Sequence, residues 1–258
     1  MTTNADTAGA LMDASSRIAA LVPRHADLPV PTCPGWTVER LAIHVGRIHR
    51  WVAVALDTPD DRPVPAVARP AAGTDVAAWL IDGANHLLEA FARVGPNGAV
   101  PAGWPNSSRA PGWAQPASWW QRRTTHETVL HAWDAAAATG TAPPIPRWLA
   151  TDAIDETLTV FAAQRLDLER FGPAATIHLH CTDTPSDATP GTVDAGEWLI
   201  HIGPDGTVTE RIHAKGDVAA RASASDLLLW AWGRVGTDRL ETFGDTAVLD
   251  RYQAAAHY

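Results

Sequence analysis

The segment Thr124-Thr125-His126-Glu127-Thr128-Val129-Leu130-His131-Ala132-Trp133-Asp134 lies within residues 117–139, which contain neither Gly nor Pro and show a helical pattern. Glu127 and His131 are four residues apart, so on a helix both side chains lie on one face. Trp120 lies on the same face, which predicts that the carboxylate and the imidazole point into the protein. A buried carboxylate is costly unless a positive group meets it. By itself, the pair is more typical of a solvated ion pair on an exposed helix.

A second histidine, His44, lies in residues 37–51, another stretch with helical periodicity. Three apolar residues share its face: Leu41, Ile48 and Trp51. An imidazole on an apolar face fits an ordinary core residue. Together with the Glu–His pair, however, it completes a set of two imidazoles and one carboxylate, which is the ligand set of a catalytic zinc site with one open position. His49 and His126 lie off the two faces and are interpreted as flanking residues.

Further motifs surround these residues in a fixed order. They are PTCPGWTV at 31–38, LAIHVGRIHRW at 41–51, HETVLHAWD at 126–134, GEWLIHIGP at 196–204, AKGDV at 214–218 and ASDLLLWAWGR at 224–234. The ordered set resembles the mycothiol-dependent maleylpyruvate isomerase family and covers nearly the whole chain. The resemblance implies a DinB-like four-helix bundle followed by a sterol-carrier-like α+β domain. It also implies that His44, Glu127 and His131 hold a metal.

The Pro-rich residues 142–146 are predicted to divide the chain into two domains, which gives an α+β fold class. Residues 1–145 form the metal-binding helix bundle, expected to be antiparallel, and residues 146–258 form a linking helix and a small α+β domain. The first bundle helix is predicted to end before Pro23, and the other three are predicted to cover about 37–55, 75–94 and 117–139. The linking helix should cover 147–170, strands should begin near 174 and 198, and Ser225-Asp226 and Thr246 should start the last helices.

Two other features of the chain leave alternatives open. The long loop 95–116 carries Trp104 and Trp113, which either line a pocket or cover the bundle. In the second domain His178 and His180 share one strand face, a spacing that can bind metal. No third ligand is evident near them in the sequence, so a solvated strand face is the simpler interpretation.

Composition excludes several classes of protein. The 258 residues carry a formal net charge of −9 without any basic run, which argues against nucleic-acid binding. No apolar run approaches the roughly 20 residues of a membrane span, and the N-terminal residues lack the regions of a signal peptide. We therefore expect a cytoplasmic protein without nucleic-acid or membrane partners, either a monomer or a weak homodimer. The two cysteines cannot form a disulfide framework; Cys33 is either a small buried side chain or a reactive thiol.

A metal with three protein ligands and one open position can ionise water or bind a thiol as thiolate. The family resemblance selects the thiol and implies a metal- and mycothiol-dependent isomerase or thiol S-transferase. Its substrate would be a small activated electrophile such as maleylpyruvate, and its cofactors would be mycothiol and a divalent metal, with zinc as the expected ion. The alternatives are a metal-dependent hydrolase and a non-catalytic module that only holds the metal.

An anionic electrophile also needs a cation, and Arg suits carboxylates because its guanidinium is a planar fork. Arg234, at the end of the apolar helix 224–233, and Arg221 are the candidate catalytic residues, and Arg47 is a third. The inward faces of the bundle offer no evident cation for this purpose.

Overall fold

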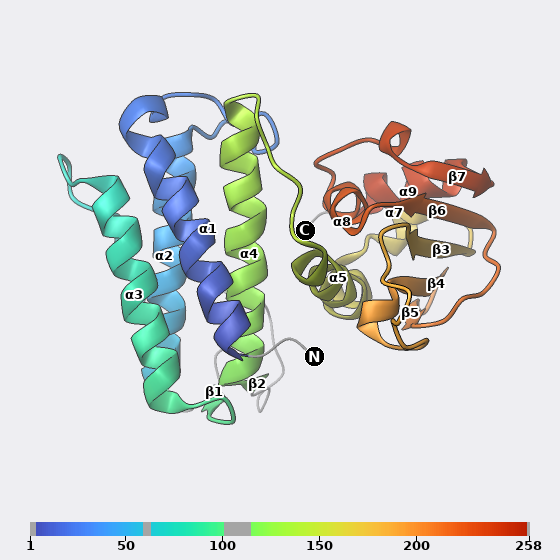
Figure 1. The fold of residues 1–258 in the computed structure, drawn as a ribbon, viewed down its shortest axis with the longest axis horizontal. Coiled ribbons are helices and arrows are strands. Elements are labelled where there is room, and N and C mark those ends of the chain that lie inside the picture. Colours follow the sequence, from blue (N-terminus) through green and yellow to red (C-terminus); the bar gives the residue numbers. More distant parts are fainter. Residues whose placement is uncertain (1–3, 59–62, 101–114, 257–258) are drawn as a thin grey trace. The chain divides into compact units, whose positions relative to one another are not determined.

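The computed structural model describes residues 4–58, 63–100 and 115–256, and the chain forms two compact units, Met1–Pro143 and Pro144–Tyr258. The first unit is helical and the second contains a sheet, so the predicted α+β class is confirmed (Figure 1). Trp104 and Trp113 lie outside the described residues. Within the described ranges, no helix combines the length and the apolar character needed to cross a membrane.

The first unit is built from long helices that lie side by side (Figure 1). In its described part these are α1 (Asn4–His25), α2 (Val38–Asp57), α3 (Val76–Val94) and α4 (Ala117–Ala138). Thr37 caps α2 as predicted, because its hydroxyl accepts a hydrogen bond from the Arg40 backbone N–H. Pro23 was expected to follow the end of α1 but lies inside its last turn. Proline removes one backbone donor, and here the helix continues past that loss.

The directions of the bundle helices differ from the expected antiparallel arrangement. Arg50 of α2 pairs with Asp82 of α3, and further along both helices Asp57 pairs with Arg93. Residue numbers therefore rise together along α2 and α3, so these two helices are parallel. Parallel neighbours in a helix bundle need a long connection, and the sequence between Asp57 and Val76 is long and rich in Pro.

A short strand pair also occurs in the first unit, where the sequence predicted no strands. β1 (Ala99–Val100) and β2 (Gln115–Pro116) pair antiparallel with each other. They do not join the larger sheet. The pair lies directly before α4, where the backbone N–H of Ala117 donates to Gly98 O at 2.8 Å, so it fixes the point at which α4 begins.

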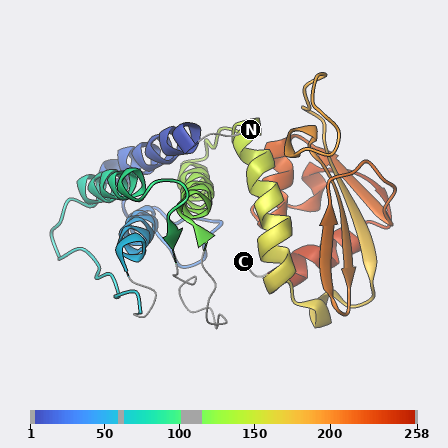
Figure 2. The ribbon, with the colours of Figure 1, turned by 90° about the horizontal axis from the view of Figure 1, so that it is seen from below.

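The second unit is a mixed sheet with helices along one of its faces (Figure 2). Its described strands are β3 (Ala175–Cys181), β4 (Glu197–Gly203), β5 (Gly206–Glu210), β6 (Val218–Ala222) and β7 (Glu241–Gly244). They lie in the order β5-β4-β3-β6-β7, and β3 and β6 are parallel while the other neighbours are antiparallel. The α-helices are α5 (Arg147–Glu156), α6 (Ala163–Arg165), α7 (Leu168–Phe171), α8 (Ala224–Ala231) and α9 (Ala247–Ala255). The remaining helical turns are a π-helical segment, Thr157–Ala162, and the 3-10 turns Val193–Ala195 and Thr237–Arg239.

Two helix predictions for this unit need correction. The expected continuous helix 147–170 is interrupted by the π-helical segment and by a break before α7. The Thr157 and Thr159 hydroxyls bond to carbonyls four residues earlier, at 2.7 and 2.6 Å, and such bonds bend helices. Ser223, rather than Ser225, caps α8, because its hydroxyl accepts from the Asp226 backbone N–H.

Strand alternation separates two faces of the sheet. Ile177, Leu179 and Ile200 are fully buried and point to the helix-covered face. The residues that alternate with them along the strands, including His178 and His180, therefore point to the other face. This alternation places polar side chains of β3 and β4 on the face that the helices leave uncovered (Figure 2).

Candidate metal centre

Helices α2 and α4 bring together the three side chains that the sequence singled out. His44 Nε2 lies 3.3 Å from Glu127 Oε1, and His131 Nε2 lies 3.5 Å from the same oxygen. One ligand atom from each of the three residues lies within 4.8 Å of the others. The His44 side chain is 32% exposed and that of His131 is 10% exposed. The donor atoms of these three residues, called the bundle cluster below, therefore converge, and His44 is the most exposed of the three.

The second carboxylate oxygen of Glu127 meets a buried arginine. Arg123, one turn earlier on α4, is 1% exposed, and its guanidinium lies 2.5 Å from Glu127 Oε2. This inward-facing cation was not identified from the sequence, where its signal was the Arg123–Glu127 spacing of four residues. Because the guanidinium is buried against Glu127, it does not supply the cation expected to face a substrate. Burial pushes the pKa of Glu127 upward, but hydrogen bonds from His131 and His44 and the charge of Arg123 outweigh it. The pKa lies well below its usual range.

The other nitrogen of His131 is held by Asp134, which is fully buried one turn later. His131 Nδ1 lies 3.0 Å from Asp134 Oδ2, and Thr32 Oγ1 donates to Asp134 Oδ1 at 2.6 Å. Burial lowers the pKa of His131, but hydrogen bonds with Asp134, Cys33 and Glu127 more than reverse this effect. The pKa of His131 is raised well above its usual value. The network thus fixes both the orientation of the ring and the position of its Nδ1 proton.

The loop before α2 supplies a wall and a thiol. The Trp36 ring centroid lies 4.7 Å from that of His44 and 5.9 Å from that of His131. Cys33 is half-buried, and its Sγ lies 3.5 Å from Asp134 Oδ2. Cys33 is therefore not an isolated apolar side chain, and its thiol lies close to the bundle cluster. Sequence periodicity did not identify Trp36, because loop residues carry no periodic signal.

Two histidines that were interpreted as flanking residues are core residues. His49 is fully buried and His126 is 1% exposed. His49 Nε2 lies 2.9 Å from the Thr128 hydroxyl. Burial, with a smaller effect from the neighbouring Arg50 charge, lowers the pKa of His49 to about 3, so it stays neutral at physiological pH. The apolar face of a bundle helix is wider than a single stripe, which is why the stricter spacing excluded them.

The three candidate arginines have partners of their own. Arg47 donates from Nε to Val67 O at 3.2 Å in the first unit. Arg221 lies on β6, 3.3 Å from Glu241 Oε2, and Arg234 donates to Trp232 O at 2.8 Å just after α8. Arg221 and Arg234 belong to the second unit, so their role at the bundle cluster stays a prediction.

The donor set of the bundle cluster fits a divalent cation. Two imidazole nitrogens and one carboxylate oxygen converge, and the remaining nitrogen of His131 bonds to a carboxylate, as ligating histidines usually do. Two carboxylates, that of Glu127, 14% exposed, and that of the fully buried Asp134, adjoin one guanidinium, that of Arg123. Among these groups one negative charge is left, which either a proton on His131 or a metal ion at the three donors would balance.

Comparison with known proteins gives matches over both units. A sequence model described as the mycothiol maleylpyruvate isomerase N-terminal domain matches residues 8–136, and one described as the MDMPI C-terminal domain matches residues 148–251. No curated protein matches the chain.

Solved structures give the same picture at the level of the fold. A crystal structure of a histidine-to-alanine mutant of the mycothiol-dependent maleylpyruvate isomerase has 18% sequence identity and a TM-score of 0.59, covering 94% of this chain and 95% of that chain. A second structure of the mycothiol-dependent maleylpyruvate isomerase has 19% identity, the same coverage and a TM-score of 0.49. At such identities the likeness of the first structure shows a shared fold.

Proposed function

Because the chain belongs to the mycothiol maleylpyruvate isomerase family, we propose that it uses mycothiol and a divalent metal to isomerise a small activated electrophile such as maleylpyruvate, or to transfer the thiol to it. Family membership makes the chain an isomerase-like enzyme. The observation that carries the finer proposal is the convergence of His44 Nε2, Glu127 Oε1 and His131 Nε2 in the bundle cluster.

These three atoms would hold the metal, and zinc suits the donor set, although two imidazoles and a carboxylate accept other divalent ions as well. A divalent metal bound there would lower the pKa of a thiol at its open position, so that mycothiol could react at neutral pH. The exposure of the His44 side leaves room for such a ligand.

The surrounding residues keep the donors in place. Arg123 binds Glu127 Oε2 and so leaves Oε1 facing the two imidazoles. Asp134 holds the proton of His131 at Nδ1, which directs the lone pair of Nε2 into the pocket. Trp36 packs against the two rings and restricts their movement on that side. The chain therefore contributes a preorganised site rather than a reacting side chain.

The cation that orients an anionic substrate must come from elsewhere. Arg123 is 1% exposed and already bonded to Glu127, so it cannot meet a substrate carboxylate. We assign this role to the second unit, first to Arg234 and then to Arg221, whose pairing with Glu241 would compete with a substrate. A planar guanidinium binds a carboxylate through two parallel hydrogen bonds, which would fix the electrophile in one orientation.

Isomerisation and thiol transfer differ in whether they consume the thiol. Isomerisation converts a cis double bond to the trans form and returns the thiol unchanged, whereas transfer consumes one thiol for each product. The test is therefore an assay of zinc-loaded protein on maleylpyruvate and a panel of other electrophiles, with and without mycothiol, in which free thiol is counted.

We expect a rate that needs both metal and mycothiol. A rate that needs the metal but no thiol would indicate a hydrolase, and tight ligand binding without turnover would indicate a binding module. His44→Ala should lose the zinc bound at the bundle cluster and the activity together. His86→Ala is the matched control, because His86 is an exposed histidine of α3 in the same unit, and it should keep both.

A further inference from the structure

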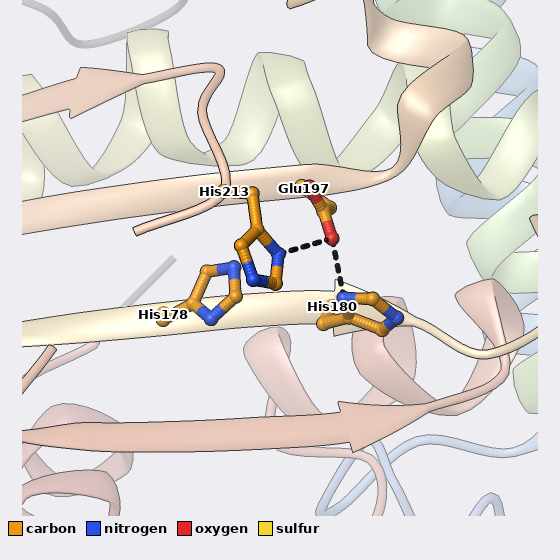
Figure 3. Close-up of side chains that lie close together, drawn as sticks. All are labelled: His178, His180, Glu197 and His213. Atoms are coloured by element: carbon orange, nitrogen blue, oxygen red, sulfur yellow. Dashed lines mark hydrogen bonds and ion pairs between the residues drawn. The ribbon is translucent and has the colours of Figure 1, made fainter. Parts of the chain in front are cut away.

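A second group of imidazoles lies on the sheet of the second unit. His178, His180, Glu197 and His213, called the sheet cluster below, each offer one ligand atom within 4.8 Å of the others. Figure 3 shows their side chains pointing toward one another. The sequence showed only the His178–His180 pair and no third ligand, and that interpretation is corrected here.

Strand pairing explains how the group forms. His178 and His180 share one face of β3, and the antiparallel register places Glu197 of β4 directly opposite His180. His213 comes from the connection between β5 and β6 and reaches over the same face. Residues from two neighbouring strands and one connection thus converge, although 35 positions separate the first from the last.

The contacts within the cluster leave one donor atom without a partner. His180 Nδ1 and His213 Nδ1 lie 2.5 and 2.8 Å from the same oxygen, Oε1 of Glu197. His178 is 6% exposed, and its Nε2 is buried without a hydrogen-bond partner among the residues that the structure describes. A buried polar atom usually has a partner, so this nitrogen calls for an additional group at the cluster.

The charge of the cluster favours a cation. Glu197 Oε1 faces Nδ1 of both His180 and His213, so the cluster holds one carboxylate among three imidazoles. One carboxylate and three nitrogen donors give a set suited to zinc, copper or nickel.

The connection that carries His213 is already fixed at both ends. Arg211 binds Asp155 through two hydrogen bonds of 2.6 and 2.8 Å, and the Thr176 backbone N–H donates to Asp217 at 2.7 Å. Between these anchors the His213 side chain is 73% exposed. A ligand that binds His213 together with the strand residues would therefore fix the middle of this connection as well.

We propose that the sheet cluster is a second metal site of this protein, in which His178, His180, His213 and Glu197 bind a divalent ion such as zinc and tie residues 211–217 to the sheet. The donors of a tetrahedral zinc lie about 3.3 Å apart, for bonds of about 2.0–2.1 Å. The exposed His213 can close the remaining distance, because its connection lacks regular structure. This site does not depend on the function proposed for the bundle cluster.

The test is a titration of the metal-free full-length chain with Zn²⁺, followed by calorimetry, with Co²⁺ absorption as a second signal. His44→Ala weakens the bundle cluster so that the sheet cluster can be measured alone. We expect this variant to bind about one equivalent of Zn²⁺ with micromolar or tighter affinity. Adding His213→Ala should weaken that binding at least about 100-fold, the upper end of what loss of a supporting residue alone costs.

The matched control is His201→Ala in the His44→Ala background. His201 lies on β4, its side chain is 45% exposed, and it has its own carboxylate partner, Glu210, at 2.9 Å. We expect this substitution to leave the zinc equivalent unchanged. Glu197→Gln, which keeps the volume of the side chain, should weaken binding as His213→Ala does. The proposal is overturned if Zn²⁺ binds the His44→Ala variant only weaker than about 100 μM, or if the His201 and His213 substitutions act equally. Circular dichroism confirms that each variant is folded.

Discussion

The bundle cluster and the sheet cluster gather similar donors in different surroundings. In the bundle, Glu127 and its histidines are backed by Arg123 and Asp134, which are 1% and 0% exposed. On the sheet, Glu197 is shared by imidazoles alone, and the His213 side chain is 73% exposed. Buried charged groups support the bundle cluster, whereas one ligand of the sheet cluster is mostly exposed to solvent.

This difference in burial predicts how strongly each cluster responds when one of its residues is replaced. Removing a partner from a buried charge leaves the charge unpaired in a region of low dielectric constant, whereas water can replace a lost partner at the surface. Changes to the bundle cluster should therefore affect both function and stability strongly. Changes to the sheet cluster should affect metal binding and the local connection while leaving the fold intact.

The largest effect is expected from Glu127→Gln. The substitution keeps the shape but removes the charged ligand that faces both imidazoles and leaves Arg123 without its carboxylate. We expect the zinc content after reconstitution to fall by about one equivalent relative to the parent, leaving only the ion at the sheet cluster, and a loss of mycothiol-dependent kcat/KM well above the roughly 100-fold that loss of a supporting residue can cost. Atomic absorption and the isomerase assay check this, with His86→Ala as control. Full zinc content and full activity in the variant would remove Glu127 from the site.

The next largest effect is expected from Arg123→Met, which tests whether a buried ion pair stabilises the protein more than an exposed one does. Arg123→Met should lower the free energy of unfolding of the metal-free protein by about 3–5 kcal/mol, because it leaves a buried carboxylate without its guanidinium. Urea denaturation followed by far-UV circular dichroism measures this, since the helices dominate the signal. The matched control is Arg93→Met, which breaks the exposed pair with Asp57 at 2.6 Å. Equal midpoints for the two variants would show that the Arg123 pair is not enclosed.

The bundle cluster could be predicted because its geometry is local to helices. Spacing of four residues places Glu127 and His131 on one face, and apolar periodicity places His44 on the inward face of another helix. The same rule, applied to Arg123, would have revealed the buried cation. This rule could not identify Trp36 and Cys33. Both lie in a loop, and helical spacing does not predict which helix a loop residue contacts.

The sheet cluster and the bundle directions could not be predicted in this way. Glu197 meets His180 only because β3 and β4 pair in one register, and a shift of a single residue would send Glu197 to the other face. His213 lies in an irregular connection. Likewise, the pattern of α2 and α3 reveals their inward faces but not their relative direction, which depends on how the connection between them returns.

A third prediction concerns the cation that faces the substrate. Arg234→Ala should leave zinc content unchanged and lower kcat/KM for an anionic electrophile by roughly 10- to 1000-fold, equivalent to about 1.5–4 kcal/mol for a lost charge-assisted contact. A neutral electrophile should be affected much less, which separates substrate orientation from a general defect. Arg239→Ala is the matched control, since Arg239 is a surface arginine of the same unit that pairs with Asp226 at 2.9 Å. Equal rates for Arg234→Ala and the parent on the anionic electrophile would contradict the assignment.

The smallest effect is expected at the connection beside the sheet cluster. Lys215 is exposed and lies two residues after His213, so trypsin can cleave after it when residues 211–217 open locally. If zinc binds only the closed form, free Zn²⁺ at ten times the dissociation constant should slow this cleavage about elevenfold, by the factor 1 + [L]/Kd. Mass spectrometry of timed digests measures the rate at this one bond. His213→Ala should show no protection at the same zinc concentration, which also controls for an effect of zinc on trypsin, while His201→Ala should be protected like the parent. Equal cleavage of the parent with and without zinc would show that metal at the sheet cluster does not restrain the connection, and the contrast between a rigid bundle site and an adjustable sheet site would then need another explanation.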